Sequence, residues 1–255
     1  MNVVVLVKSA VDEAELRADS AGHPILNGAV TKMSNFDMNG VEEAVKQKEQ
    51  NGGTVIVLTL GGADAKKAIK EAMAMGGTRA VHILAEPPDV PDSVGTAYCL
   101  AQAIKRIGAV DLVVSSEGAS DTYQGEVGAM VAEFLDLPFI AFAKKVETDS
   151  GRVRCEQGLR GGVRVLEAKL PAVVSVASGA NVPRYPTLLQ VMVAGKKAIE
   201  EIPVASLRGP DYPETGTEVL GVSVQSAARK KVLFDGTPEE AAKKLVEALR
   251  REGVI

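Results

Sequence analysis

The stretch Thr54-Val-Ile-Val-Leu-Thr-Leu60 is an apolar, β-branched run, and Ala80-Val-His-Ile-Leu84 is a second one. Between the two runs, apolar residues recur at the spacing i, i+3, i+4, i+7 and i+8, at Ala65, Ala68, Ile69, Ala72 and Met73. Short apolar runs are typical of strands buried on both faces, and the intervening spacing is typical of an amphipathic helix. Strand, helix and strand in this order predict a right-handed βαβ unit.

The same alternation continues on both sides of this unit. Val3–Val7 and Val110–Val114 are further short apolar runs, and helical spacing returns in Val94–Ala101 and Val127–Leu135. Strands that alternate with helices place helices on both faces of one sheet. The sequence therefore predicts an α/β fold with a mostly parallel, doubly wound sheet.

The pattern changes after Pro138. The strand-like runs 139–147, 152–157 and 163–168 are separated by turns that contain glycine, and they precede an apolar run at Ala172–Val176. They predict an antiparallel meander inserted before another buried strand. The stretch Ser178–Lys197 contains two prolines and has no clear period, so we expect it to be a functional or partner-facing loop.

The C-terminal part differs from the rest in composition. Pro203–Val224 is rich in Pro, Gly and Thr, which predicts an extended, exposed arm that becomes ordered on a partner. A capping box at Thr237-Pro-Glu-Glu240 predicts a last helix, which Gly253 ends. Its apolar face consists of Ala242, Leu245, Val246 and Leu249. We expect an α/β domain over residues 1–202 and an arm with a helix over 203–255 that packs on another subunit.

Composition narrows the class of protein. The chain has 255 residues, 46% of them hydrophobic and 24% charged, with a net charge of −4, which is unlike a disordered chain or a general nucleic-acid binder. The two cysteines, Cys99 and Cys155, form no CxxC pair, which argues against a disulfide scaffold, a zinc ribbon or a self-contained iron–sulfur site. No apolar run reaches the roughly 18 residues of a membrane span. The short apolar N-terminus predicts a buried strand rather than a signal peptide, and we expect a cytoplasmic protein with no membrane insertion.

The most informative segment for function is the loop Ser115–Gly128, between a predicted strand and a predicted helix. Its two glycines Gly118 and Gly125 permit close backbone approach, its hydroxyl groups are hydrogen-bond donors, and the amides of the next helix favour an anion. At more than ten residues it is longer than most connections of this kind. The segment predicts nucleotide or phosphate binding, and the alternative is a solvated loop with an ordinary helix cap.

Other catalytic and nucleotide motifs are absent. No GxGxxG follows a strand, and Leu60-Gly-Gly-Ala-Asp-Ala65 lacks both hydroxyls of the pyrophosphatase loop SGGxDS. The acidic pairs Glu42-Glu43 and Glu239-Glu240 are expected in first helical turns, where the helix dipole stabilises them. These observations predict a nucleotide-binding module without catalytic residues of its own, more a carrier or scaffold than a hydrolase.

Several segments, in order along the chain, resemble those of one family. Val5-Leu-Val-Lys8 resembles its opening strand, and Ser34–Ala44 is similar to its element N-x-x-D-x-x-A-hydrophobic-E-x-A. Ala72–Val81 resembles its segment A-M-G-A-D-x-A-hydrophobic, and Leu170–Val174 is a further match. Asn181-Val-Pro-Arg-Tyr-Pro-Thr-Leu188 resembles its partner-recognition loop N-x-P-R-Y-x-x-L. Over essentially the full chain, the sequence resembles the beta subunit of electron transfer flavoprotein.

This resemblance implies an adenine-nucleotide alpha hydrolase-like fold and a heterodimer with an alpha subunit, which holds most of the electron-carrying FAD. It implies a second nucleotide in the beta subunit. The implied nucleotide contacts are Val7, Lys8, Asn35, Asp37, Asn39, Thr59, Gly61, Ser115, Glu117, Gly118, Ser120, Asp121, Thr122, Tyr123, Gln124, Gly125, Glu126, Val127 and Gly128. The implied partner-recognition residues are Asn181, Pro183, Arg184, Tyr185 and Leu188. Leu188 is expected to lie in an exposed loop and to anchor the redox partner; the alternative is that it packs on its own subunit.

The second nucleotide is AMP in most members of the family and a second FAD in electron-bifurcating members. Ser120-Asp-Thr-Tyr123 resembles the S-D-x-Y of Fix-type members, and Glu126-Val-Gly128 is closer to Q-V-G than to the Q-T-G of AMP-binding members. These residues favour a second FAD, with AMP as the alternative; NADH oxidation follows only with a second FAD. The redox partner is then a dehydrogenase or a quinone oxidoreductase, with ferredoxin as a further acceptor if the protein bifurcates electrons. A different class, an adenine-nucleotide hydrolase or ATP-sensing protein of the same fold, is the alternative function.

Overall fold

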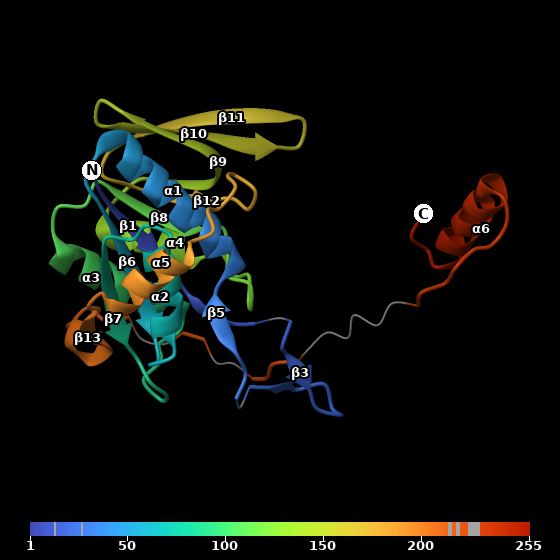
Figure 1. The fold of residues 1–255 in the computed structure, drawn as a ribbon, viewed down its shortest axis with the longest axis horizontal. Helices are drawn as coiled ribbons and strands as arrows, with labels where there is room; N and C mark the ends of the chain where they lie inside the picture. The colour runs from blue at the N-terminus through green and yellow to red at the C-terminus, as the bar shows by residue number, and fades with distance from the viewer. Residues whose placement is uncertain (13, 27, 214–215, 218–219, 224–229) are drawn as a thin grey trace.

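A nine-stranded sheet forms the centre of the molecule (Figure 1). The computed structural model describes residues 1–12, 14–26, 28–213, 216–217, 220–223 and 230–255. The strand order is β11-β10-β9-β12-β8-β1-β6-β7-β13. The six strands from β12 to β13 pair in parallel, and β9 is parallel to β12. The predicted α/β class with a mostly parallel sheet is confirmed.

The strands of this sheet are β1 (Asn2–Leu6), β6 (Thr54–Gly61), β7 (Arg79–Leu84), β8 (Leu112–Ser116), β9 (Phe139–Asp149), β10 (Arg152–Leu159), β11 (Gly162–Lys169), β12 (Ala172–Val176) and β13 (Glu200–Pro203). The helices are α1 (Asn35–Asn51), α2 (Ala65–Ala74), α3 (Ser93–Ile107), α4 (Val127–Leu135), α5 (Leu188–Lys196) and α6 (Pro238–Arg251). Short pairs β2 (Ser9–Val11) with β5 (Thr31–Met33), and β3 (Arg17–Ala18) with β4 (Pro24–Ile25), lie between β1 and α1.

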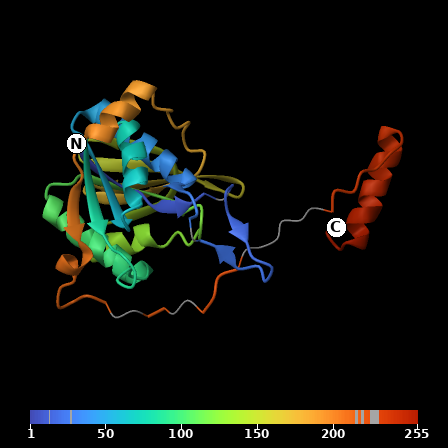
Figure 2. The ribbon, with the colours of Figure 1, turned by 60° about the horizontal axis from the view of Figure 1, so that its bottom comes forward.

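Each central strand serves two cores, because successive side chains point to opposite faces. Val3 and Val5 of β1 pack with α1 and α2, whereas Val4 and Leu6 pack with α3 and α4. Figure 2 shows this layering, with α1, α2 and α5 (blue, cyan and orange) on one face and α3 and α4 (green) on the other. The double winding follows from these continuous apolar runs.

The antiparallel meander is confirmed as β9, β10 and β11, which pair in sequence at the edge of the sheet. The cores on the two faces do not extend under all of it, and Val163 of β11 is 64% exposed. Within the described residues, no helix is long and apolar enough to cross a membrane.

Two expectations for the C-terminal half are wrong. Ser178–Lys197 is not a loop throughout, because Leu188–Lys196 forms α5. The predicted arm is not extended from its start, because Val204–Leu207 forms a 3₁₀ helix whose Val204 and Leu207 are buried against the core that contains α3. Residues 214, 215, 218, 219 and 224 of the predicted arm lie outside the described part of the chain.

The last helix begins as predicted. Thr237 and Glu240 form the capping box, and Pro238 is the first helical residue. In Figure 1 α6 (red) lies apart from the sheet, and none of its residues is buried. The predicted domain boundary between residues 202 and 203 falls within β13. A boundary after Tyr212 agrees better with the packing of Val204, Leu207 and Tyr212 on the core that contains α3. The separate role of the C-terminal part stays a prediction.

Candidate functional site

The strand order places a topological switch point between β1 and β8. From β1 the chain proceeds through β6 to β7, and it then returns across β1 through α3 to reach β8 on the other side. Ligands of open α/β sheets bind where crossovers diverge in this way, at the carboxyl ends of the strands. The residues that follow β1 and β8 therefore define the candidate site.

The structure brings the predicted loop and the end of β1 together. The Lys8 Nζ atom lies 2.7 Å from a carboxylate oxygen of Asp121 and 3.5 Å from the Thr122 hydroxyl. This ion pair joins residues that are 113 positions apart in the sequence. Both side chains are partly exposed, so the ion pair contributes little to stability by itself. It holds the Lys8 ammonium group beside the loop, paired with Asp121.

Asp37 lies beneath this pair and is buried at 3% exposure. Its carboxylate accepts a hydrogen bond from the Lys8 backbone N–H at 2.7 Å and a short one from the Ser116 hydroxyl. Burial raises the pKa of Asp37 from its ordinary 3.8 to about 7, although both hydrogen bonds oppose the shift. Through these two hydrogen bonds, Asp37 of α1 holds the ends of β1 and β8 in register with this helix.

The N-terminus of α1 also orders the loop. The Ser34 hydroxyl accepts a hydrogen bond from the Ser120 backbone N–H at 3.2 Å. The Phe36 ring packs on the Tyr123 ring with centroids 5.2 Å apart. The Tyr123 hydroxyl donates to Glu117 at 3.2 Å, and the negative charge of Glu117 raises the pKa of Tyr123. These contacts hold the loop in one shape without a helix or strand.

Three hydroxyl groups at the strand ends and in the loop are buried without a hydrogen-bond partner among the described residues. They belong to Thr59 at the end of β6, Ser115 at the end of β8 and Ser120 in the loop. Buried polar atoms are normally paired, because leaving one unpaired costs about 1–3 kcal/mol. All three residues are among the predicted nucleotide contacts. Free hydroxyls suit the oxygens of a ligand. Thr59 lies on the face of the sheet that α1 and α2 cover, whereas Ser115 lies on the other face beside Gly128 of α4, so the two would reach a ligand from opposite faces.

The glycines of the loop are required by its backbone. Gly125 has φ of +69°, and a Cβ atom there would lie 2.6 Å from the Glu117 carbonyl oxygen. At Gly118 a Cβ atom would lie 2.7 Å from the Tyr123 ring. A side chain at Gly128, on the first turn of α4, would collide with the Ser115 hydroxyl. At Gly125 the left-handed backbone favours glycine, in agreement with the prediction of close backbone approach there.

Other predicted contacts are placed differently. Val7 is buried in the core, and the Gly61 carbonyl accepts a hydrogen bond from His82 Nε2 at 3.0 Å. Asn39 is engaged with Asn181 rather than open to the site. Asn35 is exposed at the first position of α1. The remaining loop residues Gln124, Glu126 and Val127 lie at the exposed or half-buried start of α4.

We call residues 181–196 the recognition segment; it lies on the α1 and α2 side of the sheet. Its apolar side chains face solvent, with Val182 87%, Tyr185 83%, Leu188 78% and Leu189 70% exposed. Leu188 is thus exposed, as predicted, but it begins helix α5 rather than lying in a loop. The signal for this helix was the capping box of Thr187 and Gln190, which the sequence argument overlooked.

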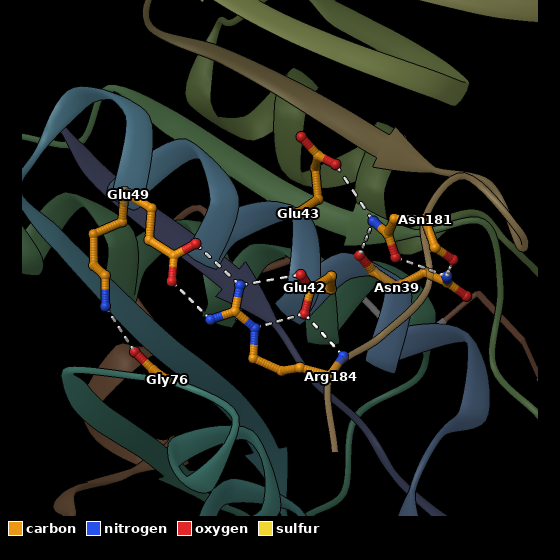
Figure 3. A network of polar contacts seen from close by, with 8 residues as sticks. Asn39, Glu42, Glu43, Glu49, Gly76, Asn181 and Arg184 are labelled. Atoms are coloured by element: carbon orange, nitrogen blue, oxygen red, sulfur yellow. Dashed lines mark hydrogen bonds and ion pairs between the residues drawn. The ribbon is translucent and has the colours of Figure 1, made fainter. Parts of the chain in front are cut away.

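Two of the predicted recognition residues point inward instead. Arg184 contacts Glu42 and Glu49 of α1, and Asn181 contacts Asn39 and Glu43 (Figure 3). The prediction that Glu42 and Glu43 lie in a first helical turn is wrong. They lie inside α1, 4% and 6% exposed, and side chains rather than a helix dipole stabilise them.

These observations define a doubly wound α/β protein with a polar switch-point site and a separate apolar surface. The model of the electron transfer flavoprotein domain matches residues 25–207. Electron transfer flavoprotein beta subunits from Thermoanaerobacterium thermosaccharolyticum and Bacillus subtilis are 32% and 33% identical to this chain, and each alignment covers both chains completely. The beta subunit from Mycobacterium bovis is 32% identical over the whole of this chain and 99% of its own.

The chain therefore belongs to the family of electron transfer flavoprotein beta subunits. Membership implies a role in electron transfer, association with a flavin and pairing with an alpha subunit. The resemblance in the sequence motifs is confirmed by these matches along the full chain.

Proposed function

We propose that this chain pairs with an alpha subunit in the cytoplasm and that the heterodimer carries electrons through FAD. The electrons come from a dehydrogenase or from NADH and pass to a downstream acceptor, a quinone oxidoreductase or, with bifurcation, also ferredoxin. FAD supplies the redox chemistry when bound, and the protein supplies binding and orientation. The proposal is supported by the family match and by the absence of a catalytic motif in the sequence.

We further propose that the switch-point site holds an adenine nucleotide. The observation that carries this proposal is the set of three buried, unpartnered hydroxyls of Thr59, Ser115 and Ser120. Ser120 would hold a phosphate oxygen together with the backbone amides at the start of α4 and the Lys8 ammonium group, and Thr59 and Ser115 would contact the nucleotide from the two faces of the sheet. Asp37 acts through Lys8 and Ser116, whose positions it holds.

A second FAD is the nucleotide that the loop residues favour. The Tyr123 ring is 55% exposed and rests on Phe36, so it offers a flat aromatic face beside the loop. A planar ring of the ligand stacks well on such a face, and the isoalloxazine of a second FAD would suit it, as would the adenine that both nucleotides contain. AMP stays the alternative, because the hydroxyls that would bind phosphate suit both nucleotides.

Two exposed surfaces support the proposed partners. The recognition segment presents Tyr185 and Leu188 to solvent, and one exposed apolar anchor suits a redox partner that must bind and release quickly. Helix α6 presents Leu245 and Val246, 46% and 39% exposed, on its apolar face. An amphipathic helix gains most of its stability by packing that face, and we assign this face to the alpha subunit.

The experiment is co-expression with an alpha subunit, followed by purification and extraction of the bound nucleotides. A yellow complex is expected, and chromatography of the extract should give more than one FAD per heterodimer if the second site holds FAD. One FAD and one AMP would select the alternative nucleotide. A colourless chain that binds no alpha subunit and hydrolyses or senses ATP would overturn the proposal in favour of the rival class.

A further inference from the structure

The entry to the recognition segment has little to hold it in place by ordinary packing. Residues 181–187 form no helix or strand, and Pro183 and Pro186 have no backbone N–H to donate. Val182 and Tyr185 are 87% and 83% exposed, and Pro183 and Pro186 are only half-buried, so apolar burial holds this stretch weakly. Polar contacts of Asn181 and Arg184 attach it to α1.

Arg184 makes five of these contacts, all with α1 (Figure 3). Glu42 accepts hydrogen bonds from the backbone N–H at 3.0 Å, from Nε at 2.8 Å and from Nη2 at 3.1 Å. Glu49 accepts from Nη1 at 2.7 Å and from Nη2 at 3.1 Å. The planar guanidinium therefore forms a two-oxygen contact with each carboxylate, a geometry that lysine cannot reproduce.

The two carboxylates contribute unequally. The Glu42 side chain is 5% exposed, and in the part of the chain that the structure describes Arg184 is the cation paired with it. A buried carboxylate needs such a partner, because leaving it unpaired is costly. The Glu49 side chain is 51% exposed, so water screens its contact with Arg184. Glu42 is therefore the stronger of the two attachments of Arg184.

A second connection lies three residues earlier. Asn39 Nδ2 donates to the backbone and side-chain oxygens of Asn181, at 3.0 and 2.9 Å, and Asn181 Nδ2 donates back to the Asn39 carbonyl at 3.0 Å. Glu43, one helical turn from Asn39, accepts from the same Asn181 amide at 3.3 Å. Two attachments on one helix fix both the position and the rotation of the stretch between them and of Tyr185 just beyond.

We propose that Arg184 is a positioning residue, which locks the recognition segment to α1 through Glu42 and Glu49 so that Tyr185 and Leu188 are held ready for the redox partner. Its guanidinium faces α1, so Arg184 acts without touching the partner. The inference rests on the proposed function for the identity of the partner. The order of the segment itself is measurable without any partner.

The experiment uses the heterodimer and two measurements. Hydrogen–deuterium exchange reports the order of residues 181–196. Reduction of the flavin by the donor dehydrogenase gives kcat and the KM for the heterodimer. Electron transfer to an artificial dye in place of the protein partner is the control. In Arg184→Gln we expect exchange in the segment and KM to rise by at least about tenfold, with kcat and dye reduction unchanged. Arg184→Lys should fall between this variant and the natural protein, because it keeps the charge and loses the two-oxygen contacts.

Two further variants keep the result interpretable. Arg184→Gln leaves Glu42 buried without a cation, whereas the double variant Glu42→Gln with Arg184→Gln removes both charges and should fold while its segment still exchanges quickly. Arg152→Gln breaks an exposed ion pair with Glu167 between β10 and β11, outside the segment and its contacts, and should change neither measurement.

Three outcomes would overturn the inference. Unchanged exchange and KM in the double variant would show that other contacts order the segment. A raised KM with unchanged exchange would mean that Arg184 contacts the partner directly. Raised exchange with unchanged KM would mean that the order of the segment does not govern partner binding. The proposed function fails separately, if the heterodimer carries no flavin or if Leu188→Ala leaves KM unchanged.

Discussion

In the loop Ser115–Gly128 and at the adjacent strand ends, buried hydroxyl groups lack partners, whereas in the recognition segment the polar groups are paired and apolar side chains are exposed. Ser115 and Ser120 of the loop have free, buried oxygens. The segment satisfies Asn181 and Arg184 on α1 and exposes Tyr185 and Leu188 to solvent. Both regions contact the same helix, the loop at its N-terminal end and the segment along the turns that follow.

The difference indicates what each region binds. A small polar ligand that hydrogen-bonds an unpaired buried oxygen removes the free-energy cost of burying it unpaired. The apolar surface of another protein removes the cost of exposing a leucine to water. An apolar ligand would not pair the oxygen, and a polar ligand would not bury the leucine. If this division holds, changes to one region should leave binding at the other intact.

Removing the chain after Tyr212 should abolish co-purification with the alpha subunit. This truncation keeps Val204 and Leu207, which are buried in the α/β domain, and removes α6 with its exposed apolar face. The point variant Leu245→Asp should weaken the heterodimer, because it places a charge on that face, and Lys243→Ala should not. Affinity pull-down and mass photometry measure both. A truncated chain that still forms a flavin-containing heterodimer would show that the C-terminal part is not needed for assembly.

Gly125→Ala should lower nucleotide affinity by about 10- to 100-fold, because a Cβ atom at positive φ costs about 1–3 kcal/mol and distorts the loop. The added atom would lie 2.6 Å from the Glu117 carbonyl. Gly161→Ala is the matched control, since Gly161 also has positive φ (+93°) but has open space around it. Nucleotide content after dialysis measures the effect. Equal loss in both variants would mean that strain, rather than the loop, governs binding.

Leu188→Ala should weaken binding of the redox partner by about 2 kcal/mol, or about 30-fold, with the melting temperature unchanged. Leu188 is 78% exposed, so the variant removes little packing within the chain. Leu26→Ala, another exposed leucine at 57%, is the control outside the segment. Electron transfer with the partner and with a dye separates the two effects. Slowing in both assays would contradict the anchor role.

Asp37→Asn should raise the melting temperature of the nucleotide-free chain by a few degrees at pH 8 and by less at pH 5. The pKa of Asp37 is raised from 3.8 to about 7, so the natural protein loses stability as the pH rises from about 4 through 7, where the folded state must ionise a buried carboxyl. The asparagine variant has no such loss. Calorimetry across this range measures the difference, with Asp149→Asn in an exposed turn as the control. A difference independent of pH would show that Asp37 stays ionised.

The sequence predicted most of the sheet because its signals are local. The apolar run Ala172–Val176 has the same bounds as β12, and the capping box at Thr237 begins α6. Apolar period and cap chemistry depend on neighbours within a few residues. Nothing distant is needed to interpret them.

The extent of α1 and of α5 was missed for opposite reasons. α1 buries polar residues such as Glu42, Glu43 and Gln47, which break the apolar period. α5 is apolar nearly all round and only Ala194 is buried, so its nine residues show no polar face. In both helices, contacts with other parts of the molecule decide which side chains are buried. Hydrophobic periodicity depends only on the polarity of the side chains, so it does not indicate these helices.

Local chemistry along the chain is enough to predict the alternation of strands and helices, the meander, the last helix and the loop with its glycines. The folded structure is needed to show that Arg184, predicted to face a partner, instead faces Glu42, which lies 142 positions away. It also decided which hydroxyls stay unpaired. The physical reason is that the free-energy cost of burying a charge or a hydroxyl depends on which groups lie next to it in the folded protein. Its position in the sequence does not specify those neighbours.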